Sequence, residues 1–155
     1  MPGEETLPAF LELPVHNDRD SIIRNIRSNV LLGLPELTQH EWREHALLIV
    51  GGGPSLKDYL PIIRAYRPDC DVLAVNGAYR YLRSEGIDAD HFLLIDSRAE
   101  NVAHVEDASD RTNHCLASQV HPLVVDELLG KPITLFHLGT DTARAALPGK
   151  FRFLT

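Results

Sequence analysis

The chain holds three short groups of glycine and polar residues that could bind a charged ligand, and each follows an apolar run. After ALLIV comes the turn Gly51, Gly52, Gly53, Pro54 and Ser55; after DVLAV come Asn76 and Gly77; after HFLLI come Asp96, Ser97 and Arg98. Backbone amides hold phosphates, and carboxylates hold Mg²⁺ or ribose hydroxyls. These groups therefore favour a ligand that carries phosphate.

The glycine-rich turn has the composition of a phosphate-binding loop. Its glycines let the backbone turn tightly and approach a ligand, and Ser55 with Asp58 forms the S-x-x-D pattern of a capped helix start. Free N–H groups and the positive end of that helix would then face one point, which suits a phosphate. Leu56 replaces the third glycine of the dinucleotide fingerprint, and no G-K-[ST] follows as in a Walker A loop. The alternative is a turn that only lets a helix pack on a strand.

The other two groups each allow a functional and a structural interpretation. Asn76 either projects into the crevice beyond the sheet or forms a turn that caps the next helix. Asp96 either holds Mg²⁺ on a polyphosphate or caps a helix, and we expect it to be the catalytic and metal-binding residue. Ser97 with Glu100 favours a cap. Arg98 either neutralises phosphate charge or lies in water.

Elements of alternating type must position these groups. The predicted strands are 46–50, 71–75, 91–95, 114–118 and 133–138. The predicted helices are one between Asp18 and Gly33, a short one that begins at residue 99, and those over 56–66, 78–84, 122–129 and 142–147. Consecutively apolar strands must be covered on both faces, and strands alternating with helices form a parallel sheet. We therefore predict a Rossmann-like three-layer α/β fold with a mostly parallel sheet, whose ligands bind beyond the carboxyl ends of the strands.

Composition and charge fit one soluble domain. The 155 residues are 44% hydrophobic and 24% charged, and the net charge of −7 argues against a general nucleic-acid binder. We expect an irregular acidic arm over residues 1–17 and a single nucleotide-binding domain over 18–155, with truncation at its C-terminus as one interpretation. No apolar run could cross a membrane and the start is acidic, so we expect no membrane partner and a cytoplasmic location.

The remaining reactive side chains predict structural roles. Cys70 and Cys115 stand apart without a metal-binding pattern and are expected as reduced thiols in the core. The 8 histidines show no HxH or HExxH spacing, so no dedicated transition-metal site is expected, and His121 is expected to be structural. The strand edge and the apolar tail 151–154 predict a homo-oligomer.

Three segments resemble a known family. IVGGGPSLKDYLPIIR, DVLAVNGAYRYLRSEGIDADHFLLIDSR and CLASQVHPLVVDELLGK are similar to the MptE-like 6-hydroxymethylpterin diphosphokinases, a family that also takes in the motility-accessory-factor glycosyltransferases. A shorter likeness, GGGPSLKD with Asn76, extends to bacterial sialyltransferases that use a CMP-sugar donor. The resemblance implies a nucleotide-phosphate pocket lined by Gly51, Gly53, Pro54 and Ser55, with Asn76 on the nucleotide and Asp96 at the metal or phosphates.

The resemblance also implies one of two reactions. The diphosphokinases transfer diphosphate from ATP, with Mg²⁺, to the hydroxymethyl group of a reduced pterin, whereas the glycosyltransferases transfer a nonulosonic acid from a CMP-activated donor. The implied cofactors are therefore Mg²⁺ and ATP, or a CMP-activated sugar. Family members usually continue into a glycine-rich turn, a helix and a G-x-D strand, so a non-catalytic nucleotide-binding module is a third interpretation.

Overall fold

The computed structural model describes residues 18–38 and 44–150, and the expected acidic arm and apolar tail lie outside these ranges. The elements in chain order are α1 (Arg19–Leu31), β1 (Ala46–Val50), α2 (Leu56–Tyr66), the 3₁₀ helix η1 (Arg67–Asp69), β2 (Cys70–Val75), α3 (Ala78–Ser84), β3 (His91–Leu94), the 3₁₀ helix η2 (Ala99–His104), β4 (Asn113–Ala117), α4 (Pro122–Glu127), β5 (Ile133–Phe136) and α5 (Asp141–Ala146). All five predicted strands are present, and β3 and β5 end earlier than predicted, at Leu94 and Phe136.

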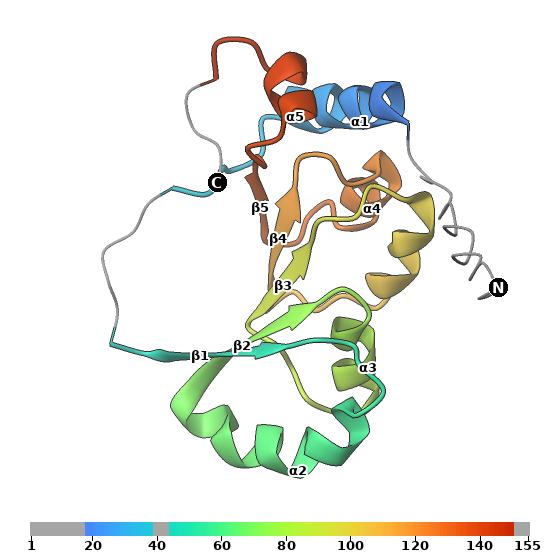
Figure 1. Cartoon of the computed structure of the whole chain (residues 1–155). Helices are drawn as coiled ribbons and strands as arrows, with labels where there is room; N and C mark the ends of the chain where they lie inside the picture. The colour runs from blue at the N-terminus through green and yellow to red at the C-terminus, as the bar shows by residue number, and fades with distance from the viewer. Residues whose placement is uncertain (1–17, 39–43, 151–155) are drawn as a thin grey trace, which may run out of the picture.

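The five strands form one parallel sheet in the order β1-β2-β3-β4-β5. This arrangement confirms the predicted Rossmann-like three-layer α/β class. Crossovers between parallel strands are right-handed, so strands added in one direction place their connecting helices on one side of the sheet. Figure 1 shows α2, α3 and α4 on that side, with α1 and α5 packed together beyond β5.

The two faces of the sheet are covered to different extents. On the face that packs against α2, α3 and α4, the side chains of Val72, Phe92 and Leu116 are fully buried. On the other face, Ala117 and Phe136 are buried at β4 and β5. On β1, by contrast, Leu47 and Ile49 are 51% and 65% exposed. Since β1 is also an edge strand, it offers apolar surface for the expected self-association, which stays a prediction.

Tyr79 fixes α3 against the sheet. Its side chain is fully buried, and its ring centroid lies 4.8 Å from that of Phe92. The backbone N–H of Ser109 donates to the Tyr79 hydroxyl at 2.9 Å. This anchor holds the start of α3 in place, and with it the turn of Asn76 and Gly77 that comes directly before the helix.

Two buried asparagines fix α1 across the loops that follow β3 and β4. Asn25 and Asn29 lie one turn apart on the same face of α1, and each donates two hydrogen bonds from Nδ2. The four accepting atoms are backbone carbonyl oxygens, those of Ser97 (3.3 Å) and Gln119 (3.2 Å) for Asn25 and those of Ser118 (3.0 Å) and Val120 (2.8 Å) for Asn29. These bonds link α1 to the carboxyl edge of the sheet.

Replacing Asn29 tests this link. Asn29→Ala should lower the free energy of unfolding by about 2 kcal/mol, because two buried carbonyls lose their donor. The loss is limited because the substitution also removes Asn29 Oδ1, which is buried without a partner. Urea unfolding measures the change, with Ser28→Ala on the exposed neighbouring residue as the control. Equal stabilities of the two variants would contradict the assigned role of Asn29.

Candidate functional site

The three predicted groups all lie at the carboxyl edge of the sheet, each after its own strand. The first two groups share a pocket of about 340 Å³ between the turn after β1 and the start of α3. Its lining residues are Gly52, Gly53, Pro54, Leu56, Lys57, Gly77 and Tyr81. The third group, with Asp96, does not line this pocket. The structure therefore brings the glycine turn and Gly77 together and places Asp96 beside a different part of the edge.

The glycines of the turn have different structural roles. A Cβ atom at Gly52 would lie 3.3 Å from the backbone nitrogen of Ala78, so a side chain there would crowd the close approach of the turn to α3. A Cβ atom at Gly51 would meet nothing within 4 Å, and one at Gly53 only Ser55 Oγ at 4.0 Å. Gly52 therefore fits the interpretation of a turn that lets a helix pack closely, whereas Gly53 leaves open space beside the pocket.

The turn exposes backbone donors at the start of α2. The N–H groups of Gly52, Gly53 and Ser55 donate no hydrogen bond to the described residues. Leu56 N is the first that bonds within the turn, to Gly53 O at 3.0 Å. These free N–H groups lie at the positive end of α2, a helix of 11 residues. This is the arrangement that binds phosphates in proteins.

The predicted cap by the Ser55 side chain is wrong. Ser55 has the helical conformation φ −79°, ψ −9°, and its hydroxyl makes no capping hydrogen bond. The N–H of Asp58 instead donates to the backbone oxygen of Ser55 at 2.9 Å. A capping serine needs an extended backbone to direct its hydroxyl at the first turn. The Ser55 hydroxyl is therefore left at the exposed turn with the free N–H groups.

Asn76 is held in a left-handed conformation that leaves its side chain exposed. Its φ is +51°, which asparagine tolerates better than most residues. The Asn76 N–H donates to Leu93 O at 3.1 Å, and its carbonyl accepts from Tyr79 N at 3.2 Å. Asn76 and Gly77 therefore form the turn that the structural alternative expected, whereas the N-cap position of α3 is Gly77. The amide of Asn76 is available to a ligand.

Asp96 and Arg98 form a closed ion pair. Asp96 Oδ2 accepts from Arg98 Nε at 2.8 Å and Nη2 at 2.5 Å, and Asp96 Oδ1 accepts from the Arg98 backbone N–H at 3.0 Å. The guanidinium of Arg98 holds the pKa of Asp96 below its usual value. The N-cap position of η2 is Arg98 rather than Ser97, which is buried. Arg98 is thus bound to Asp96 rather than lying alone in water.

The ion pair with Arg98 occupies the carboxylate of Asp96, which is the expected magnesium ligand. Both Asp96 oxygens accept hydrogen bonds from Arg98, so a Mg²⁺ ion at Asp96 would share the carboxylate with the guanidinium. Within residues 18–38 and 44–150, no cluster of three or more His, Cys, Asp or Glu side chains could hold a metal. The described residues therefore do not form a ready cation site, and Asp96 as a metal ligand stays a prediction.

His104 belongs to the site although no sequence pattern indicates it. Its ring carbon Cε1 would lie 3.4 Å from a Cβ atom at Gly77, and it lines a hollow that continues from Gly77 along α3. Burial and the nearby Arg80 lower the pKa of His104, while the Asp96 carboxylate raises it. The charge of Asp96 therefore influences the pKa of His104, and the ring of His104 lies against the Gly77 turn. It connects the two parts of the edge.

Comparison with known proteins identifies the family. The family described as 6-hydroxymethylpterin diphosphokinase MptE-like matches residues 20–151. The chain belongs to this family. No curated protein matches the MptE-like chain.

Within the described residues, no helix is both long and apolar enough to cross a membrane.

A solved structure shares the fold of the MptE-like chain. The MAf glycosyltransferase from Magnetospirillum magneticum AMB-1 superposes with a TM-score of 0.65 at 18% identity over 87% of this chain. This chain spans 22% of the length of that protein. At this level of identity the likeness shows the fold alone.

The charges around His104 predict how it titrates in the MptE-like chain. The pKa of His104 should lie below its ordinary value, fall further in Asp96→Asn and rise in Arg80→Gln, because a nearby anion stabilises the protonated ring and a nearby cation destabilises it. NMR titration of the imidazole signals measures the pKa. Asp58→Asn, at the start of α2, is the control and should leave the pKa unchanged. Shifts in the same direction in both variants would contradict the geometry.

Proposed function

We propose that the MptE-like chain binds a nucleotide by its phosphates at the glycine turn and acts as a transferase. The observation that carries this proposal is the set of free N–H groups of Gly52, Gly53 and Ser55 at the start of α2, beside the pocket shared with Gly77. The family supports the transferase class. A cytoplasmic location, where nucleotides are abundant, is part of the proposal.

The family description favours transfer of diphosphate from ATP to a 6-hydroxymethylpterin. In that reaction the acceptor hydroxyl oxygen attacks the β-phosphorus of ATP, the bond to the α-phosphate oxygen breaks, AMP leaves, and the hydroxyl proton passes to a base. The free N–H groups would position the phosphates, and positioning with charge stabilisation carries most of such catalysis. Mg²⁺ would neutralise phosphate charge when bound, with Asp96 as its proposed ligand. Asn76 and Gly77 would contact the nucleotide.

The solved glycosyltransferase favours a second candidate function. Its fold is shared over 87% of this chain, so the same pocket could hold the phosphate of a CMP-activated sugar. A melting screen with ATP, CTP, CMP and 6-hydroxymethylpterin, each with and without Mg²⁺, separates the two functions by nucleotide preference. Nucleotide binding without turnover would instead support a non-catalytic binding module.

A pair of glycine variants tests the phosphate site. Gly53→Val should abolish the nucleotide-induced rise in melting temperature, because its side chain would extend into open space beside the free N–H groups. Gly51→Val is the matched control, since a Cβ there also meets nothing within 4 Å and Gly51 does not line the pocket. Both variants should fold. If the rise is the same in both, the ligand binds elsewhere.

Asp96→Asn tests the metal role. The variant should lose the Mg²⁺-dependent part of ATP binding and lose less than about 1 kcal/mol of stability at pH 7, as for a partly exposed ion pair. Because the pKa of Asp96 is lowered in the folded state, this stability is present above the unfolded pKa and is lost as the pH falls through the folded pKa. Calorimetric titration with and without Mg²⁺ measures binding, with Asp58→Asn as the control. Equal Mg²⁺ dependence in wild type and Asp96→Asn would leave Asp96 only as the partner of Arg98.

A further inference from the structure

The end of the sheet at β1 carries an exposed apolar surface. Leu47 and Ile49 point to the face away from the helices, because Leu48 between them belongs to the core on the helical face, and both are largely exposed. Among the described strands β1 pairs only with β2, so the backbone groups along its other side have no strand partner. Edge strands are commonly protected by a charge or a proline, and residues 46–50, ALLIV, contain neither. This edge is therefore open to another strand.

The outer side of α2 continues the apolar surface. Tyr59, Ile62 and Tyr66 are between 49% and 60% exposed, and their spacing of three and four residues places them on one side of the helix. The opposite side faces α3, because Arg64 donates to the backbone oxygen of Glu85 at the end of that helix. The three exposed side chains therefore point away from the middle of the sheet, toward the free edge of β1. Figure 1 shows α2 at this end of the sheet.

The β1 strand is self-complementary. In an antiparallel pair of β1 strands centred on Leu48, Leu47 of each copy would lie directly opposite Ile49 of the other. The apolar side chains that each copy exposes would then cover each other. The two-fold axis of such a pair is perpendicular to the sheet, so the helices of both copies would lie on the same face.

The exposed side of α2 is self-complementary under the same axis. The two α2 helices would run antiparallel beside each other, and the series Tyr59, Ile62 and Tyr66 is nearly the same in both directions. Ile62 would then lie beside Ile62 of the second copy, and Tyr59 near Tyr66. One two-fold axis therefore accounts for the exposed apolar side chains of both the strand and the helix.

Charge and area favour a second copy as the occupant. The chain has a net charge of −7, so two copies repel each other over much of their surface, whereas the exposed side chains of β1 and of this side of α2 carry no charge. Together the apolar side chains expose on the order of 500 Å² per copy, and a pair would bury about 1,000 Å², which reaches the lower limit of a specific interface.

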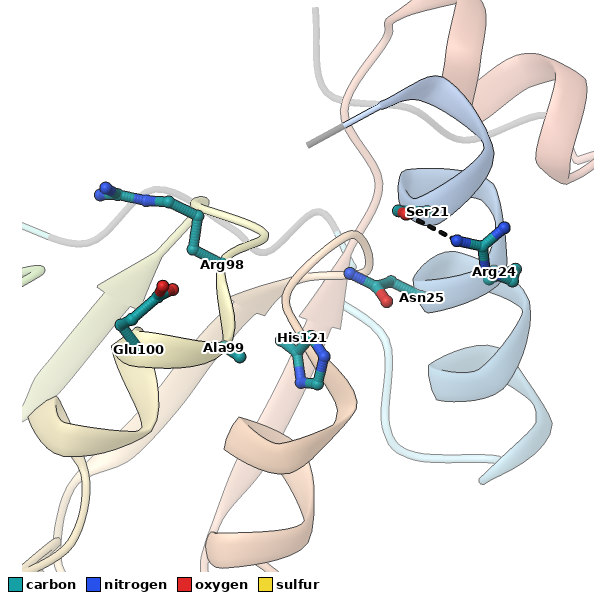
Figure 2. Close-up of a pocket in the computed structure, with 7 residues that line it drawn as sticks. All are labelled: Ser21, Arg24, Asn25, Arg98, Ala99, Glu100 and His121. Atoms are coloured by element: carbon teal, nitrogen blue, oxygen red, sulfur yellow. Dashed lines mark hydrogen bonds between the residues drawn. The ribbon is translucent and has the colours of Figure 1, made fainter. Parts of the chain in front are cut away.

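We infer that β1 and the outer side of α2 join two copies of the chain into a dimer, with the two sheets paired through antiparallel β1 strands. This surface shares no residue with the glycine-turn pocket. It also shares none with a second pocket of about 340 Å³ between α1, the start of η2 and the start of α4, which Figure 2 shows. The inference is therefore independent of the proposed nucleotide site.

Sedimentation velocity of the full chain over the micromolar range tests the inference, and a dimer is expected. Ile49→Lys should convert the protein to a monomer, because the pairing would bury the new charge in both copies. Leu129→Lys, in the exposed turn after α4, is the matched control and should remain a dimer. Circular dichroism checks that both variants are folded. A monomeric wild type, or equal dimerisation of the two variants, would overturn the inference.

A charge exchange at Ile62 tests the two-fold pairing by restoring it. Ile62→Lys and Ile62→Glu should each be monomeric alone, since the axis brings like charges together. An equal mixture of the two should form a mixed dimer, because opposite charges then meet. The inference is overturned if the mixture stays monomeric while both variants are folded, or if either variant alone dimerises as strongly as wild type.

Discussion

The carboxyl edge of the sheet after β3 and β4 depends on the hydrogen bonds from the two buried asparagines of α1 to the loops there. Loop carbonyls at a sheet edge have no strand partner, and burying them without a donor is costly. Asn25 and Asn29 supply those donors from consecutive helical turns. They thereby bring α1, from before the first strand, to the carboxyl edge of the sheet.

The same constraint explains why the edge is divided into two parts. The loops after β1 and β2 are positioned by α2 and α3, and they leave free N–H groups beside the glycine-turn pocket and an exposed, left-handed Asn76. The loops after β3 and β4 are held by α1 through hydrogen bonds to their backbone carbonyls. Of the two parts, the one positioned by α2 and α3 therefore offers the free N–H groups that favour an anion.

The fold could be predicted from the sequence because its strands are short apolar runs separated by helical patterns. The positions of the three groups follow from that pattern, since parallel strands place their carboxyl ends together. The side-chain bonds could not be predicted. Ser55 fits a capping pattern, but its helical backbone conformation prevents the cap, and the N-cap position of η2 is Arg98 rather than Ser97. His104 and Asn25 carry no motif, and contacts distant in sequence bring them to the site.

The acidic character of the chain limits how it can hold a phosphate. With a net charge of −7, the protein as a whole repels polyphosphates, and Arg98 has much of its charge compensated by Asp96. Backbone N–H groups at a helix start attract an anion at short range without adding a formal charge. A glycine turn with free donors therefore suits this protein better than a cluster of lysines. The Asp96–Arg98 pair does not line the glycine-turn pocket, and each of its charges is largely compensated by the other.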